Sequence, residues 1–156
     1  MKILLLAPLP FFEVRETPLN VLAVIRSLTE LGHQVELLSF PQGTNVDVPG
    51  LVHHRSLRLP VGHVKAGPSL AKILLDIPFL VEAVLRLVFS RPDAVHAVEE
   101  AAHLVAPFTR LLRIPLVVDV DSSIPDQLRY TGFATRGPLL YVAELLENHA
   151  LRHAAA

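Results

Sequence analysis

Short apolar runs alternate along the chain with longer segments whose apolar residues recur at helical spacing. The short runs have the length and composition of buried strands: residues 2–7, 34–39, 51–57, 94–98 and 114–120. The longer segments have the spacing of helices: residues 17–32, 69–90, 99–113 and 138–156, with a further helix opening at Pro125. Strands that are apolar on both faces and alternate with helices predict an α/β fold, with a mainly parallel sheet and helices on both faces.

The segment of residues 69–90 is apolar and long enough to span a bilayer. Its charged residues fall on one stripe of a helical projection: Lys72, Asp76, Glu82 and Arg86. We expect this stripe to face water while the rest of the helix packs on the sheet, with an interruption or kink near Pro78. Contact with a membrane surface is the alternative interpretation.

Composition narrows the class of protein. The chain has 156 residues, 51% of them apolar, and a formal net charge of -1. This length predicts one domain, and the balanced charge, without any Lys/Arg cluster, argues against a nucleic-acid partner. Because there is no cysteine, a disulfide framework, a thiolate zinc site and a cysteine nucleophile are excluded.

Ligands of parallel sheets bind beyond the carboxyl ends of the strands, which places candidate function at residues 8–17, 39–45, 98–101 and 121–127. The first of these loops lacks the glycines that dinucleotide binding requires. It offers Glu13, Arg15 and Glu16, with Thr17 as N-cap and Pro18 as the first residue of the next helix. Such a loop can receive an anion or a sugar hydroxyl, and a solvated charged loop fits the sequence equally well.

The stretch VVDVDSSIPDQL, residues 117–128, ends a strand in two carboxylates. Asp119 and Asp121 point to one face of the strand, about 7 Å apart. Three interpretations are open: the pair holds a divalent metal, Asp121 and the serines bind substrate hydroxyls or act as acid and base, or Asp119 is a structural acid and the segment caps the next helix.

The stretch HAVEEAAH, residues 96–103, also resembles a site. We expect Glu99 and Glu100 in the first turn of the following helix, where the helix dipole favours acids, and for Glu100 this structural role is a sufficient explanation. We also expect His96 and Glu99 to face the same crevice. His149 and His153 have helical spacing but no surrounding metal motif, so no metal site is expected there.

Together these segments resemble the N-terminal domain of family 4 glycosyltransferases of the GT-B fold. The resemblance rests on MKILLLAP, VLAVIRSLTELGHQVELLSF and RPDAVHAVEEAAHLVAPFTRLLRIPLVVDVDSS, in that order. It implies a Rossmann-like, doubly wound domain over residues 1–156 that serves the acceptor side of a retaining, metal-independent transferase. The nucleotide-sugar donor would be held mostly by a second, C-terminal domain that is absent here, so the fragment alone should be inactive and needs no cofactor of its own.

The chain departs from the family pattern at two places. The first loop lacks the usual glycines, and Asp121 stands where many members carry a histidine near the donor sugar. We therefore expect Asp121 as the catalytic residue by inference from this sequence. The expected substrate-binding residues are Glu13, Arg15, Glu16, Thr17, Glu99, Ser122, Ser123 and Gln127, all facing one cleft.

The resemblance implies a sugar or lipid-linked acceptor without identifying it. A cytoplasmic location, with peripheral contact with the inner membrane surface, is also expected. Two alternatives stay open, a metal-dependent DxD transferase and a non-catalytic binding or assembly domain of the same fold. The helix predicted at residues 138–156 has no stop signal, which is typical of a domain from a longer protein.

Overall fold

The structure of this chain, a computed structural model, describes residues 1–61, 69–120, 123–132 and 136–154. Within these residues, five parallel strands form one sheet in the order β3-β2-β1-β4-β5. The strands are β1 (Lys2–Ala7), β2 (Gln34–Ser39), β3 (Leu51–Arg55), β4 (Ala94–Val98) and β5 (Leu116–Asp119). The predicted positions of all five strands are confirmed, and β3 and β5 are the edge strands.

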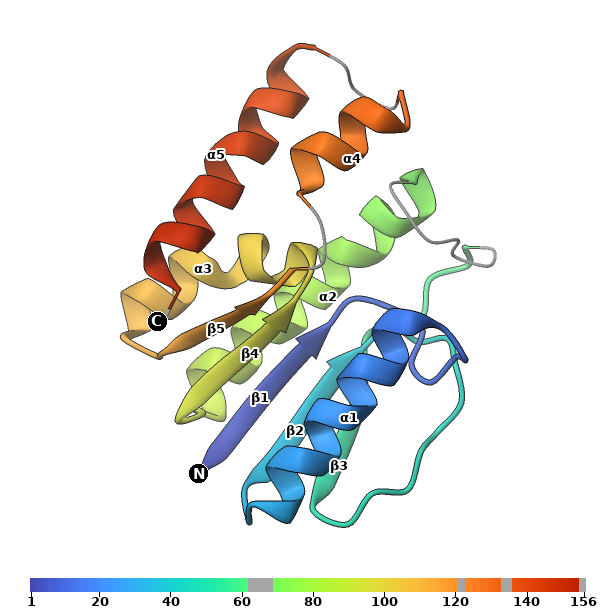
Figure 1. Cartoon of the computed structure of the whole chain (residues 1–156), viewed down its shortest axis with the longest axis vertical. Coiled ribbons are helices and arrows are strands. Elements are labelled where there is room, and N and C mark those ends of the chain that lie inside the picture. The colour runs from blue at the N-terminus through green and yellow to red at the C-terminus, as the bar shows by residue number, and fades with distance from the viewer. Residues whose placement is uncertain (62–68, 121–122, 133–135, 155–156) are drawn as a thin grey trace.

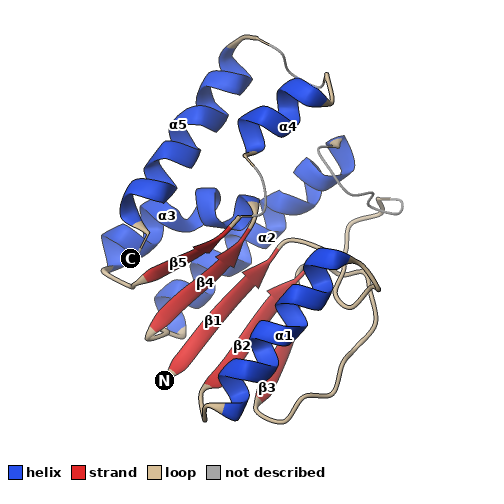
Figure 2. Ribbon diagram, in the orientation of Figure 1, coloured by secondary structure: helices blue, strands red, loops and turns tan. Residues whose placement is uncertain are grey.

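The helices lie on both faces of the sheet (Figures 1 and 2). They are α1 (Glu16–Glu30), α2 (Leu70–Phe89), α3 (Glu100–Leu112), α4 (Ile124–Tyr130) and α5 (Pro138–His153). Helix α1 covers one face, α2 and α3 cover the other, and α5 packs along α3 beside the sheet. The predicted α/β class, a doubly wound sheet with helices on both faces, is confirmed.

Strand β1 supplies both cores because its side chains alternate between the two faces. Leu5 packs against α1 through Val21 and Ile25. Leu4 and Leu6 point the other way, into the core made with α2 and α3. Each of these leucines is fully buried, and burial of such a side chain contributes about 1.5–3 kcal/mol. The run LLLA is therefore apolar throughout because neither face of β1 meets water.

Helix α1 begins earlier than predicted. Its N-cap position is Arg15, which makes no side-chain capping bond, so Thr17 is the second helical residue and Pro18 the third. Proline is tolerated there because the amide groups of the first helical turn have no partner within the helix. The predicted end at Gly32 is confirmed: Gly32 has φ +81°, and its amide donates to the carbonyl of Thr29 at 3.0 Å.

The prediction that the charged stripe of α2 faces water is wrong. Lys72 Nζ lies 2.7 Å from Glu100 Oε1 of α3, and Glu82 Oε1 accepts a hydrogen bond from the amide of Leu57 at 2.8 Å. Arg86 lies 4.0 Å from the carboxylate of Glu36 on β2. The stripe faces inward because charged and polar groups from three other elements pair with it.

The outward side of α2 is instead apolar. The exposed residues on it are Leu70, Ile73, Leu74, Ile77, Val81, Leu85, Val88 and Phe89, which we call the α2 apolar face. The helix runs without a break through Pro78. None of the helices formed by the described residues is long and apolar enough to cross a membrane.

Asp76 lies within the inward stripe, and its Oδ1 has no hydrogen-bond partner among the described residues. Burial raises the pKa of this carboxyl to about 7, and the nearby Glu100 carboxylate acts in the same direction, whereas Lys72 opposes them. Asp76 is therefore mostly protonated below neutral pH in the folded protein.

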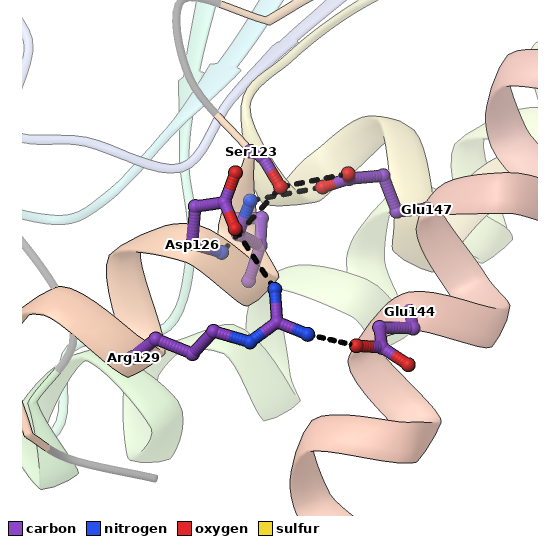
Figure 3. A network of polar contacts seen from close by, with 6 residues as sticks. Ser123, Asp126, Arg129, Glu144 and Glu147 are labelled. Atoms are coloured by element: carbon purple, nitrogen blue, oxygen red, sulfur yellow. Dashed lines mark hydrogen bonds and ion pairs between the residues drawn. The ribbon is translucent and has the colours of Figure 1, made fainter. Parts of the chain in front are cut away.

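Helix α4 is held by polar contacts with α5 (Figure 3). The carboxylate of Glu147 accepts two hydrogen bonds, from Ser123 Oγ and from the amide of Ile124, each at 2.9 Å. One turn away, Arg129 pairs with Asp126 of α4 and with Glu144 of α5. These contacts fix the start of α4, the next helix along the chain after β5.

We predict that Asp76→Asn stabilises the protein increasingly as pH rises. The unfolded carboxyl titrates near 3.8 and the folded one near 7, so wild-type folding loses stability as pH rises between these values. Urea unfolding at pH 5 and pH 8 should show a larger advantage of the variant at pH 8. Asp47→Asn, which removes the same charge from an exposed position, should not reproduce this difference. An advantage of Asp76→Asn that is equal at both pH values would contradict the assignment.

We predict that Glu147→Ala costs about 1.5–3 kcal/mol of unfolding free energy, because two hydrogen bonds to an ionised acceptor are lost. Glu144→Ala removes a more exposed ion pair on the same helix and should cost at most about 1 kcal/mol. Urea unfolding compares the two variants, and amide hydrogen exchange should become faster in α4 for Glu147→Ala. Equal losses in both variants would show that Glu147 does not anchor α4.

Candidate functional site

The strand order brings three candidate loops together. Strand β1 lies between β2 and β4, and β4 pairs with β5, so the carboxyl ends of β1, β4 and β5 are consecutive along one edge of the sheet. From β1 the chain adds β2 and β3 on one side of the sheet, and it then crosses back to add β4 and β5 on the other side. Ligands of open parallel sheets bind where the strand order switches in this way. The predicted loops at residues 8–17 and 98–101 therefore leave the same edge at which β5 ends with Asp119 (Figure 1).

The loop after β1 is fixed to the loop after β2. Phe12 and Thr44 exchange backbone hydrogen bonds of 2.7 and 3.1 Å. Gly43 has φ +99°, and a Cβ atom there would lie 2.5 Å from the backbone of Phe11, so only glycine fits. The first loop thus has defined geometry without glycines of its own.

The predicted residues of the first loop lie at the start of α1. Glu13 Oε2 and Arg15 form an ion pair at 3.1 Å, and both are half-buried. Glu16 is exposed and is the first helical residue, where the helix dipole favours an acid, so it belongs to the helix and not to the loop. Thr17 lies within the first turn. These four side chains therefore lie where the loop after β1 joins α1.

Glu99 follows β4 in a backbone conformation that non-glycine residues rarely adopt, with φ 53° and ψ -133°. Its amide donates to the carbonyl of Asp119 at 2.8 Å, so the pairing of β4 with β5 extends to this residue. Such strained conformations gather at functional sites. The prediction that both acids lie in the first turn of the helix is confirmed for Glu100 and wrong for Glu99, which precedes α3 as its N-cap residue.

His96 and Asp119 lie side by side on β4 and β5. His96 Nε2 is 3.4 Å from Asp119 Oδ2, and the Asp119 side chain is 36% exposed. The strand register places both side chains on the same face of the sheet as α1. Val117 also lies on this face and is 43% exposed. Among the described contacts, the Asp119 carboxylate pairs with His96, which agrees with the interpretation of Asp119 as a structural acid. That His96 and Glu99 share a crevice stays a prediction.

The loop after β5 leads to α4. Asp121 and Ser122 lie outside the described residues. Ser123 is the N-cap of α4: its oxygen accepts from the amide of Asp126 at 3.5 Å, and its hydroxyl donates to Glu147. The alternative in which this segment caps the next helix is confirmed for Ser123. Gln127 lies one turn farther along and is half-buried.

Gln127 lines a groove between α2, α3, α4 and α5, which we call the four-helix groove. Its volume is about 350 Å³. Most of the side chains that line it are apolar: Ile73, Ile77, Leu80, Leu104, Ile124, Leu128, Leu139, Val142, Ala143 and Leu146. Its polar lining residues are Ser69, Lys72, Asp76, Glu100, His103 and Gln127. The groove lies on the α2 and α3 side of the same sheet edge.

His103 is a buried member of this lining that the sequence did not single out as a candidate. Neither ring nitrogen has a hydrogen-bond partner among the described residues, and the Glu147 carboxylate is 3.8 Å away. Burial lowers the pKa of the ring, so it is neutral at pH 7. No local motif marks His103, Asp76 or Glu147, because their neighbours come from different helices.

The described residues bring together no group of three or more histidine, aspartate or glutamate side chains that could hold a metal ion.

Three solved structures resemble the fold. A sucrose-phosphate synthase from Thermosynechococcus elongatus has a TM-score of 0.68 and 15% identity, over 99% of this chain and 41% of that one. MurG from Acinetobacter baumannii has a TM-score of 0.55 and 17% identity, over 98% and 39%. The glycotransferase of kitacinnamycin has a TM-score of 0.51 and 15% identity, over 99% and 42%. The chain thus spans about two-fifths of the length of these proteins.

No sequence among the curated proteins matches the chain. The sequence profile of the glycosyl transferase 4-like domain, however, matches residues 20–156, which is most of the chain. The resemblance inferred from the order of sequence motifs is therefore confirmed, together with the Rossmann-like fold it implies. The chain belongs to the glycosyl transferase 4-like domain family.

Proposed function

We propose that the chain is the acceptor-binding domain of a retaining glycosyltransferase. In this proposal the whole protein moves a sugar from a nucleotide-sugar donor to a sugar or lipid-linked acceptor without a bound metal. A second, C-terminal domain holds the donor, so residues 1–156 alone do not turn over substrate. The family match supports glycosyl transfer in general, and the finer parts rest on the sequence resemblance.

The observation that carries the proposal is the placement of Glu99. It lies in a strained backbone conformation at the end of β4, between the ends of β1 and β5. A carboxylate held in this way can accept a hydrogen bond from an acceptor hydroxyl and orient it for attack on the donor sugar. Its backbone bond to Asp119 fixes its distance from the β5 exit.

The other predicted residues take supporting roles in the proposal. Glu13 and Arg15, with Thr17, border the acceptor from the β1 side, where their ion pair keeps the loop in place. Asp121 stands near the donor sugar in place of a histidine, and Gln127 reaches the acceptor from α4. Ser123 holds α4 in position because its hydroxyl is already bonded to Glu147.

Glu99→Gln in the whole protein should lower kcat/KM for the acceptor about 10–100-fold, because a charge-assisted hydrogen bond to the carboxylate is replaced by a weaker one to a neutral amide oxygen. The affinity for the nucleotide sugar should stay unchanged, since the proposal places the donor on the other domain. Sugar transfer is measured over a panel of nucleotide sugars, and donor binding by calorimetry.

Glu30→Gln, at the exposed end of α1, is the matched control and should leave both quantities unchanged. Full transfer activity in Glu99→Gln would exclude the proposed role of this residue. Absence of transfer from every nucleotide sugar, with wild-type protein and a broad acceptor panel, would favour the non-catalytic binding or assembly domain.

Removal of divalent metal separates the proposal from the DxD alternative. We expect EDTA to leave the transfer rate unchanged. The alternative makes the opposite prediction: Mn²⁺ would raise the melting temperature of the wild type, and Asp121→Asn would abolish that increase. Thermal melts with and without Mn²⁺, run beside the transfer assay, decide between them.

A further inference from the structure

The four-helix groove combines apolar walls with buried polar groups that lack partners. Ile73 and Ile77 of α2 face Leu139 and Val142 of α5 across a volume of about 350 Å³. His103, in the lining from α3, is only 5% exposed, and neither ring nitrogen has a hydrogen-bond partner among the described residues. The groove is therefore mostly apolar, and the buried histidine in its lining is neutral because burial lowers its pKa.

The charges around the groove select the kind of occupant. The Lys72 ammonium is paired with Glu100, and His103 is neutral because burial lowers its pKa. The described lining holds no other lysine or arginine, so an anionic group would find no free cationic partner there. The apolar walls, in turn, cannot replace the water around a cation. An uncharged aliphatic chain satisfies both constraints.

The rim of the groove adjoins the predicted acceptor site. Ser69, Glu100 and Ile124 lie at the N-terminal ends of α2, α3 and α4, which is the carboxyl edge of the sheet. Glu100 is next in the chain to Glu99, and Gln127 lines the groove from α4, the helix that follows β5. A ligand whose chain fills the groove can therefore place its polar end beside the β4 and β5 exits.

The groove also opens to the outside on an apolar surface. Ile73 and Ile77 belong to the α2 apolar face, with exposures of 43% and 59%, while Leu139 and Val142 of α5 are each 47% exposed. An aliphatic chain can enter between these residues without crossing a polar rim. Its burial is favourable because apolar area is removed from water on both partners.

We propose that the four-helix groove binds an uncharged aliphatic chain of the acceptor, and that the sugar or hydroxyl end of the same acceptor lies at the exits of β4 and β5. This inference rests on the proposed function for the role of the polar end. The groove itself is defined by the packing of the four helices.

Binding of three probes of equal chain length to the full chain tests the proposal: octyl glucoside, octanoate and octylammonium, each below its micelle concentration. We expect saturable binding of octyl glucoside by calorimetry, at least about tenfold weaker binding of the two charged probes, and none of methyl glucoside. Equal binding of all three octyl probes, or tighter binding of a charged one, would overturn the uncharged occupant.

Two pairs of variants locate the binding. Ile77→Ser should weaken octyl glucoside binding about tenfold, whereas Leu85→Ser, on the same exposed face of α2 but outside the groove, should not. Ala143→Phe fills the groove and should abolish binding. Leu145→Phe adds a similar ring to the outward side of α5 and should leave binding unchanged. Equal effects within both pairs would show that the chain binds to the general apolar surface instead.

The transfer assay separates this inference from the proposed function. Transfer to acceptors without an aliphatic chain, combined with no binding of octyl glucoside, would disprove the groove and leave the proposed function standing. Binding of octyl glucoside in the groove, without transfer from any nucleotide sugar, would support the groove and disprove the proposed function. If both hold, Ile77→Ser should raise KM for alkyl acceptors about tenfold and leave kcat unchanged, as expected for loss of uniform binding energy.

Discussion

Coverage of both faces of a parallel sheet is the constraint on which the other features of this molecule depend. Parallel strands need crossover connections, and helices in those connections cover the sheet on both sides. Here α1 covers one face and α2 with α3 covers the other, with β1 buried between them. Because all five strands run in one direction, their carboxyl ends lie at one edge. The candidate site exists at that edge for this reason.

Helix α2 shows how the same constraint reverses an ordinary amphipathic pattern. Its core residues, among them Leu75, Phe79 and Ala83, are fully buried against the sheet. Its charged residues do not lie opposite this row but beside it, where β2, the chain after β3, and α3 supply partners. Ionisable groups that are partly withdrawn from water need such partners. The side that is left for the surface is apolar.

The candidate site at the strand ends and the four-helix groove lie on neighbouring parts of one edge. Glu99 and Glu100 are adjacent in sequence but serve different places: one ends β4, and the other pairs with Lys72 at the groove. Glu147 connects the two, because it anchors the start of α4 and lies near His103. Under the proposed function, a single acceptor with a polar and an apolar part would use both features of this arrangement.

The sequence alone determined the fold class, the positions of the five strands and of the long helices, and the loops in which a site was expected. These depend on local apolar periodicity, which is a property of the sequence itself and does not require contacts between distant residues. Helix ends shifted by one or two residues, as with Thr17 and Glu99, because hydrogen bonding at a helix end depends on the neighbouring chain.

Only the tertiary structure decided which side of α2 faces water, that Ser123 is engaged by Glu147, and that Asp76 and His103 line a groove. The sequence was wrong about the charged stripe because a helical projection shows which residues share a side, but not what lies opposite them. Pairing and burial depend on residues tens of positions away, such as Glu36 and Glu100, and folding alone brings these into contact.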